Sequence, residues 1–119
     1  MAIQRPVEHN LYTKMGGTFA FDFSITVNGE PYSLSEQEVQ AQVRPFKNSP
    51  TLIAEMNTFV NSETGLISLS LTAEETVAIN PGTYWYDVAL VDRRSEVPTV
   101  DYWLEGKFIV NGRVTEVEL

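Results

Sequence analysis

The sequence predicts an all-β protein, an antiparallel β-sandwich with one or two short helical turns. Three observations lead to this fold class. Apolar and polar residues alternate in several short segments, which is typical of strands with one buried face. Turn-forming pairs such as Asn28 and Gly29 separate these segments at regular spacing. Residues 69–92 combine a strand, a helical turn, a Pro-Gly turn and a long aromatic strand, which together predict the corner of a sandwich.

The clearest predicted strand spans residues 18–27. Its apolar residues occupy every second position and therefore share one face: Phe19, Phe21, Phe23, Ile25 and Val27. Asn28 and Gly29 follow as a hairpin turn. Pro31 and the polar residues up to Gln37 keep the chain out of a sheet for a few residues, with room for one helical turn beginning at Ser35.

The next segments predict two strands joined by loops. Residues 39–44 alternate and end at Pro45, and residues 47–50 predict a loop. Residues 51–60 alternate again and predict a second strand, although the pattern does not decide which of its faces points inward. Residues 61–65 predict the turn that follows.

The sandwich corner lies in the second half of the chain. A strand is predicted at residues 66–71, and Thr72 can cap a helical turn in which Glu75 closes a capping box. Pro81 and Gly82 then turn the chain into the strand at residues 83–92.

The last long strand is predicted at residues 100–110, after a hairpin loop at 93–98. Gly106 in its middle predicts a bulge or a close approach of another backbone segment. Residues 114–119 predict a further short strand or an extended tail. Alternation assigns four residues of the long strand to one side: Tyr102, Leu104, Phe108 and Val110.

Composition limits the classes of function. The 119 residues are enough for one domain, and we expect an N-terminal arm at residues 1–15 and one sandwich at 16–119. Eight Lys and Arg stand against sixteen Asp and Glu, so the net charge of -8 disfavours nucleic acid and anionic membranes as partners. The absence of cysteine excludes disulfides and thiolate metal sites. The sequence contains no signal peptide and no apolar run long enough to span a membrane, which predicts a soluble protein folded in a cytoplasm.

The order Pro81, Gly82, Thr83, Tyr84, x, Tyr86 resembles the tyrosine corner of immunoglobulin-like domains. Tyr84 occupies the place of the corner tyrosine, and Tyr86 stands where antibody domains have their second cysteine. The disulfide and its partner tryptophan are absent, so the resemblance is to immunoglobulin-like domains in general rather than to antibody domains.

Four motifs in order carry a closer resemblance. They are Gly-x-x-Phe-x-Phe-x-Phe-x-Ile at 16–25, Leu-Thr-x-x-Glu-Thr at 71–76, Pro-Gly-x-Tyr-x-Tyr-Asp-Val-x-Leu-x-Asp at 81–92 and Leu-x-Gly-x-Phe-x-Val at 104–110. The chain is similar in these motifs to immunoglobulin-like structural domains of tailed bacteriophages, known best as the amino-terminal domain of baseplate upper proteins. The similarity extends over nearly the whole chain.

The resemblance implies a structural, non-enzymatic virion protein that is made and folded in the host bacterial cytoplasm. It implies an adaptor or attachment subunit of the tail, baseplate or fibre base that docks onto other virion proteins, as a homo-oligomer or in symmetric copies. Baseplate members continue into helical or receptor-binding regions, whereas this sequence stops at Leu119, which equally fits a capsid decoration protein.

The sequence predicts no catalytic, cofactor or metal site. His9 is the only histidine, so it cannot supply a zinc site, and no nucleophile motif surrounds it. Four carboxylates on or near the last two long strands suggest calcium binding or acid–base chemistry, but their spacing favours surface charge that protects strand edges: Asp87, Asp92, Asp101 and Glu105.

Aromatic residues on the last two long strands predict contacts with a partner. Because neighbours on a strand face opposite ways, one of each pair must point away from the core. Loops or a neighbouring subunit cover such a side chain, or it anchors an interface with a different protein, or it stacks on sugar. A carbohydrate-binding module is therefore an alternative function. With the terminal segments and the hairpin tip, the predicted interface residues are Arg5, Val7, Leu11, Tyr12, Trp85, Arg93, Arg94, Trp103, Val117 and Leu119.

Overall fold

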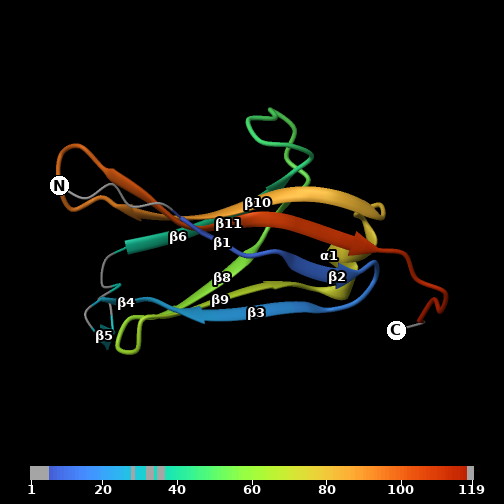
Figure 1. Ribbon diagram of the computed structural model, residues 1–119, viewed down its shortest axis with the longest axis horizontal. Coiled ribbons are helices and arrows are strands. Elements are labelled where there is room, and N and C mark those ends of the chain that lie inside the picture. The colour runs from blue at the N-terminus through green and yellow to red at the C-terminus, as the bar shows by residue number, and fades with distance from the viewer. Residues whose placement is uncertain (1–5, 28, 32–33, 35–36, 118–119) are drawn as a thin grey trace.

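The protein is a β-sandwich whose two sheets lie one above the other in Figure 1. The structure is a computed structural model, and it describes all residues except 1–5, 28, 32–33, 35–36 and 118–119. The described strands of the first sheet are ordered β1-β11-β10-β6-β7, with β2 also paired to β11. Their bounds are Val7–Glu8 for β1, Leu11–Lys14 for β2, Gln37–Arg44 for β6, Ala54–Glu55 for β7, Gly82–Asp92 for β10 and Thr99–Asn111 for β11.

The second sheet has the order β3-β9-β8 within the described residues, and all its pairs are antiparallel. Its strands are Phe19–Ser24 for β3, Asn57–Asn61 for β8 and Leu66–Leu71 for β9. A separate hairpin pairs β4 (Thr26–Val27) with β5 (Glu30–Pro31), as the turn signal at residues 28–29 predicts. The helical turn α1 spans Ala73–Val77.

This strand order is that of an immunoglobulin-like domain, and the predicted fold class is confirmed. The second sheet corresponds to strands B, E and D of that fold, and β11, β10 and β6 correspond to G, F and C, with β7 beside them as in variable-type domains. The first strands of the chain run parallel to β11.

The core lies between the sheets and is built by the alternation seen in the sequence. Ile67, Leu69 and Leu71 of β9 are almost completely buried, and so are Val43 of β6 and Val88 of β10. The ring of Phe19 meets that of Phe108 edge to face at 5.2 Å, which joins β3 of one sheet to β11 of the other.

The sandwich corner forms as the sequence predicts. Both bonds of the capping box are present, because Glu75 N donates to Thr72 Oγ1 (3.1 Å) and Thr72 N donates to the Glu75 carboxylate (2.9 Å). The hydroxyl of Tyr84 donates to the carbonyl oxygen of Asn80 at 2.6 Å, which is the hydrogen bond of a tyrosine corner.

The single strand predicted at residues 51–60 is wrong. The chain forms β7, which pairs with β6 in the first sheet, and then β8, which pairs with β9 in the second sheet. Met56 is buried at the crossing and its N–H donates to Ala41 O. The two short strands belong to different sheets, so the segment has no single inward face. This explains why the alternation did not define one.

The predicted placement of Tyr102 on the same side as Leu104, Phe108 and Val110 is also wrong, because a β-bulge interrupts β11. Val88 pairs with Leu104 but Ala89 pairs with Tyr102, which leaves Trp103 as an extra residue. The side chain of Tyr102 is 51% exposed, whereas Trp103 packs against the core. The bulge therefore exchanges the two faces that simple alternation assigns.

The N-terminal segment belongs to the first sheet, where β1 and β2 pair in parallel with β11. Between them, the hydroxyl of Tyr86 donates to the carbonyl oxygen of His9 at 2.5 Å. A Cβ atom at Gly106 would collide with the same carbonyl group, so the predicted close backbone approach at Gly106 is confirmed. At the other end of the chain, residues 114–117 form no strand, which leaves the extended tail.

Candidate functional site

The candidate site lies on the outer face of the first sheet, beneath the loop that joins β6 to β7. This loop rises from the sheet at the top of Figure 1. The guanidinium of Arg44 fixes it by donating to the carbonyl oxygen of Ser49 (3.2 Å) while also donating to Gln42 Oε1 (2.8 Å). Ser49 is buried, and Asn48 adopts a positive φ of 65° that turns the chain back. These contacts hold the loop in place beside the sheet, and we call it the loop wall.

Trp85 lies at the foot of this wall, paired with Arg44 on one neighbouring strand and with Lys107 on the other. The ammonium groups of Lys47 and Lys107 lie over its ring, at 5.2 and 5.7 Å from the centroid. Lys47 also forms an ion pair with Glu105 at 3.2 Å. Basic side chains therefore gather around one indole in a chain that is acidic overall.

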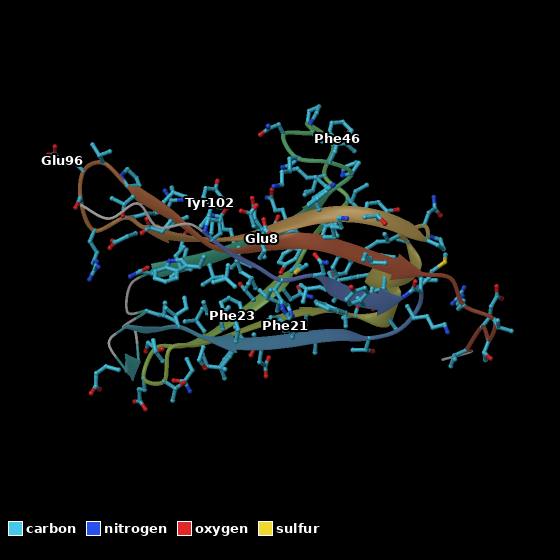
Figure 2. The ribbon with its side chains drawn as sticks, in the orientation of Figure 1. Glu8, Phe21, Phe23, Phe46, Glu96 and Tyr102 are labelled. Carbon is cyan, nitrogen blue, oxygen red and sulfur yellow. The ribbon has the colours of Figure 1, made fainter. Side chains whose placement is uncertain are left out.

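Two adjoining hollows, of about 520 and 510 Å³, run along this face. They share four lining residues: Asn48, Asp87, Tyr102 and Glu105. The two hollows therefore form one depression, which we call the trough. The first hollow extends to Arg44, Phe46 and Trp85, and the second extends to Pro6, Val100 and Asp101. Figure 2 shows Phe46 on the projecting loop and Tyr102 on the sheet, both away from Phe21 and Phe23.

A row of carboxylates crosses the sheet at the level of the trough. Asp87 pairs directly with Glu105, and Glu105 pairs in turn with Glu8 of β1. Partial burial raises the pKa of the Asp87 carboxyl, and the charge of Glu105 raises it further, while Arg44 and Lys47 act in the opposite direction. Like charges in directly opposed positions destabilise a sheet, so this row is held at an energetic cost.

Three of the four carboxylates do not protect strand edges, which corrects part of the interpretation made from their spacing. Asp87, Asp92 and Glu105 have paired strands on both sides, whereas the described pairing of Asp101 is with β10 alone. Asp92 is separate from the row and forms an ion pair with Arg94. Within the described ranges, no group of three or more His, Asp or Glu side chains is placed to hold a metal ion.

The single histidine has a structural environment. The ring of His9 stacks on Phe21 at 5.1 Å, and its carbonyl oxygen receives the Tyr86 hydroxyl. Burial and the nearby charge of Glu105 raise the pKa of Tyr86, so its hydroxyl stays protonated and keeps donating to His9. In the portion of the chain with described placement, no helix is long and apolar enough to cross a membrane.

The residues predicted for an interface are not gathered in one place. Trp85 lines the trough, and Val7 and Tyr12 are exposed on the adjoining N-terminal strands. Leu11 is buried between the sheets because it faces the core from β2. Trp103 is turned toward the core by the bulge.

The predicted charged contacts lie at the hairpin between β10 and β11. Arg93 pairs with Glu38 at 3.3 Å, and the guanidinium of Arg94 pairs with the carboxylate of Asp92. Val117 is exposed in the C-terminal segment. Arg5 and Leu119 lie outside the described residues.

Sequence reasoning missed the loop residues Phe46 and Asn48 and the outward position of Tyr102. The signal for the loop was present, since Lys47 to Pro50 is rich in turn formers, but nothing local indicates that the loop folds back over Trp85. Tyr102 was missed because a bulge carries no fixed sequence signature, although aromatic residues on paired strands did point to this face.

No protein-family model matches the sequence, and no curated protein matches it. Among solved structures, the chain is similar to the N-terminal domain of phage TP901-1 ORF48. That comparison gives a TM-score of 0.48 at 11% sequence identity, and it covers 87% of this chain and 98% of the other.

Proposed function

We propose that the protein is a non-enzymatic structural component of a bacteriophage virion that docks onto other virion proteins. The observation that carries this proposal is the trough: a rigid loop wall, exposed aromatic side chains and opposed charges on one face of a sandwich. Exposed aromatic residues beside charged groups are typical of protein interfaces. The four phage motifs in the sequence support the same role.

The chemistry of the trough favours binding over catalysis. Its carboxylates sit among groups that already engage one another, because Glu105 is paired with Lys47, and Lys47 also lies over Trp85. The histidine that would serve as a general base stacks on Phe21 and lies away from the trough lining.

We place the protein in the tail, baseplate or fibre base as an adaptor, with capsid decoration as the alternative. Mass spectrometry of separated heads and tails from purified particles tests this directly. Recovery with tails supports the adaptor role, recovery with heads supports decoration, and absence from both fractions refutes the proposed function.

We propose further that the protein acts in symmetric copies. Light scattering coupled to size-exclusion chromatography of the purified chain measures this. A stable trimer or larger ring supports the proposal, and a monomer at all concentrations removes homo-oligomerisation while leaving docking onto other proteins in place.

The alternative of a carbohydrate-binding module is less well supported by the positions of the two tryptophans. Sugar rings stack on an open aromatic face, whereas two lysine ammonium groups lie over Trp85 and Trp103 packs against the core. The open rings on this side belong to Tyr102 and Phe46, at 51% and 57% exposure. A test for sugar binding should therefore substitute Tyr102 rather than either tryptophan.

A further inference from the structure

The trough combines features that favour one kind of occupant. Its floor holds Asp87 and Glu105 in directly opposed positions, and the pairing of β1 adds Glu8 to the row. Of these three carboxylates, Glu105 has the Lys47 ion pair. Among the described residues, no donor forms a hydrogen bond or ion pair with Asp87. Asp87 therefore has no direct partner among the described side chains, although Arg44 and Lys47 act on its charge from farther away.

The cations nearest to this row are already engaged. Arg44 donates both to Ser49 and to Gln42, so its guanidinium holds the loop. Lys107 lies over Trp85. We therefore expect a further positive group to come from a partner, and an overall charge of -8 favours a basic partner.

The rims of the trough suit a planar cation. Tyr102 and Phe46 both line the first hollow, and each residue is about half exposed. A guanidinium stacks on such rings while donating to carboxylates in its own plane. The side-chain amide of Asn48 adds a further acceptor from the loop.

We propose that the trough binds an arginine or lysine side chain from a neighbouring protein, which contacts Asp87 and packs against Tyr102. This inference deepens the docking role and rests on it. The raised pKa of Asp87 supports it, since a carboxylate that ionises with difficulty in the free protein gains from a cation supplied on binding.

The test uses the purified chain and a probe of defined charge. The probe is the pentapeptide acetyl-Gly-Arg-Gly-Arg-Gly-amide, and its matched control carries citrulline, the neutral isostere of arginine, in both positions. Backbone amide shifts in NMR titrations at low salt should move at Asn48, Asp87, Tyr102 and Glu105 with the arginine peptide and stay in place with the citrulline peptide. Equal shifts with both peptides, or shifts confined to another face, would overturn the proposal.

Two variants test whether binding of the arginine peptide depends on the charge of Asp87. Asp87→Asn should weaken binding of the arginine peptide about fivefold, because one charge-assisted contact at a partly exposed site is lost. Asp22→Asn removes the same charge from the exposed face of β3 and should leave the affinity within about twofold. An unchanged affinity in Asp87→Asn contradicts the assignment even if the peptide binds.

Two further arms separate the alternatives. Binding of a chitin oligosaccharide at the trough, with no response to the arginine peptide, refutes the basic occupant and revives the carbohydrate function. The head and tail fractionation described above is independent of these titrations. Virion incorporation without arginine binding therefore refutes this inference alone, whereas arginine binding by a protein absent from particles refutes the docking role.

Discussion

The outer faces of the two sheets differ in charge, relief and side-chain size. The first sheet presents the trough, with a loop wall, basic groups around Trp85 and a row of carboxylates. The second sheet presents mostly small polar side chains and one exposed ring: Ala20, Asp22, Ser24, Asn57, Phe59, Asn61, Leu66, Ser68 and Ser70. Asp22 is the one charged residue among those outward positions.

The inner faces of the same strands are alike, since aliphatic and aromatic side chains from both sheets form one core. The comparison teaches that the inner faces hold the fold, while the outer faces are free to specialise. One outer face has acquired charges that oppose one another, and the other has remained nearly neutral. Four predictions test how far this separation holds.

The largest expected effect comes from the space between the sheets. Phe108→Ala removes a fully buried ring that meets Phe19, and it should lower the free energy of unfolding by about 3–5 kcal/mol. Phe59→Ala, on the outer face of the second sheet, should change it by less than about 0.5 kcal/mol. Urea unfolding followed by tryptophan fluorescence measures both free energies of unfolding. A comparable decrease in both variants would contradict this prediction, because it would show that the exposed ring of Phe59 also stabilises the fold.

The second prediction concerns the attachment of the N-terminal strands to the first sheet. Gly106→Ala places a Cβ against the His9 carbonyl and should cost about 1–3 kcal/mol, because the segment must move away. The amide of His9, which donates to Glu105 O, should exchange with solvent faster. Amide shifts of the second sheet should stay as in the wild type, and a global loss of its signals would contradict a local effect.

The third prediction addresses the loop wall. Arg44→Met keeps the aliphatic stem but removes the hydrogen bonds to Ser49 and Gln42, and should cost about 1 kcal/mol. Hydrogen exchange across residues 46–50 should accelerate while the outer face of the second sheet is unaffected. Arg93→Met breaks an exposed ion pair at the hairpin and serves as the control, with an effect below about 0.5 kcal/mol.

The smallest effects are expected from pH, and they have opposite signs at two aspartates. The folded pKa of Asp87 is raised by burial and by Glu105, against Arg44 and Lys47, so its ionisation costs stability above the unfolded pKa. Asp87→Asn should therefore melt at a higher temperature than the wild type at neutral pH. This difference in melting temperature should disappear as the pH falls below the pKa of the unfolded state.

At Asp92, hydrogen bonds from the side chain and backbone of Arg94 lower the pKa to about 2, so ionisation adds stability above the unfolded pKa. Asp92→Asn should melt at a lower temperature than the wild type at neutral pH, and this gap should close as the pH falls toward about 2. Thermal melts of both variants across this pH range measure these differences. Melting temperatures that shift in the same direction for both variants would contradict the prediction.

Sequence predicted the parts of the fold that depend on neighbouring residues. The capping box of Thr72 and Glu75 and the corner of Tyr84 are short-range geometries, and both are present. The bulge at Trp103 and the change of sheet at Met56 depend on partners distant in sequence, so alternation alone misplaced Tyr102 and merged β7 with β8.

The candidate site was predicted in part for the same reason. Aromatic residues on paired strands indicated this face, and Trp85 lies on it. The wall was missed because it depends on the positive φ of Asn48 and on the reach of Arg44 to Ser49, neither of which has a distinctive pattern. Asp87 and Glu105 of the carboxylate row were singled out from the sequence, but Glu8 was missed because the pairing of β1 with β11 joins residues far apart in the sequence.

That last pairing has a consequence for how the molecule is made. β1 and β2 form their hydrogen bonds with β11, so residues 7–14 have no strand to join until residues 104–111 leave the ribosome. All the strands from β3 to β11 must be made before the edge of this sheet closes. Until then the apolar side chain of Leu11 stays exposed to other chains, and a slow or paused ribosome lengthens the period in which nascent copies can associate wrongly.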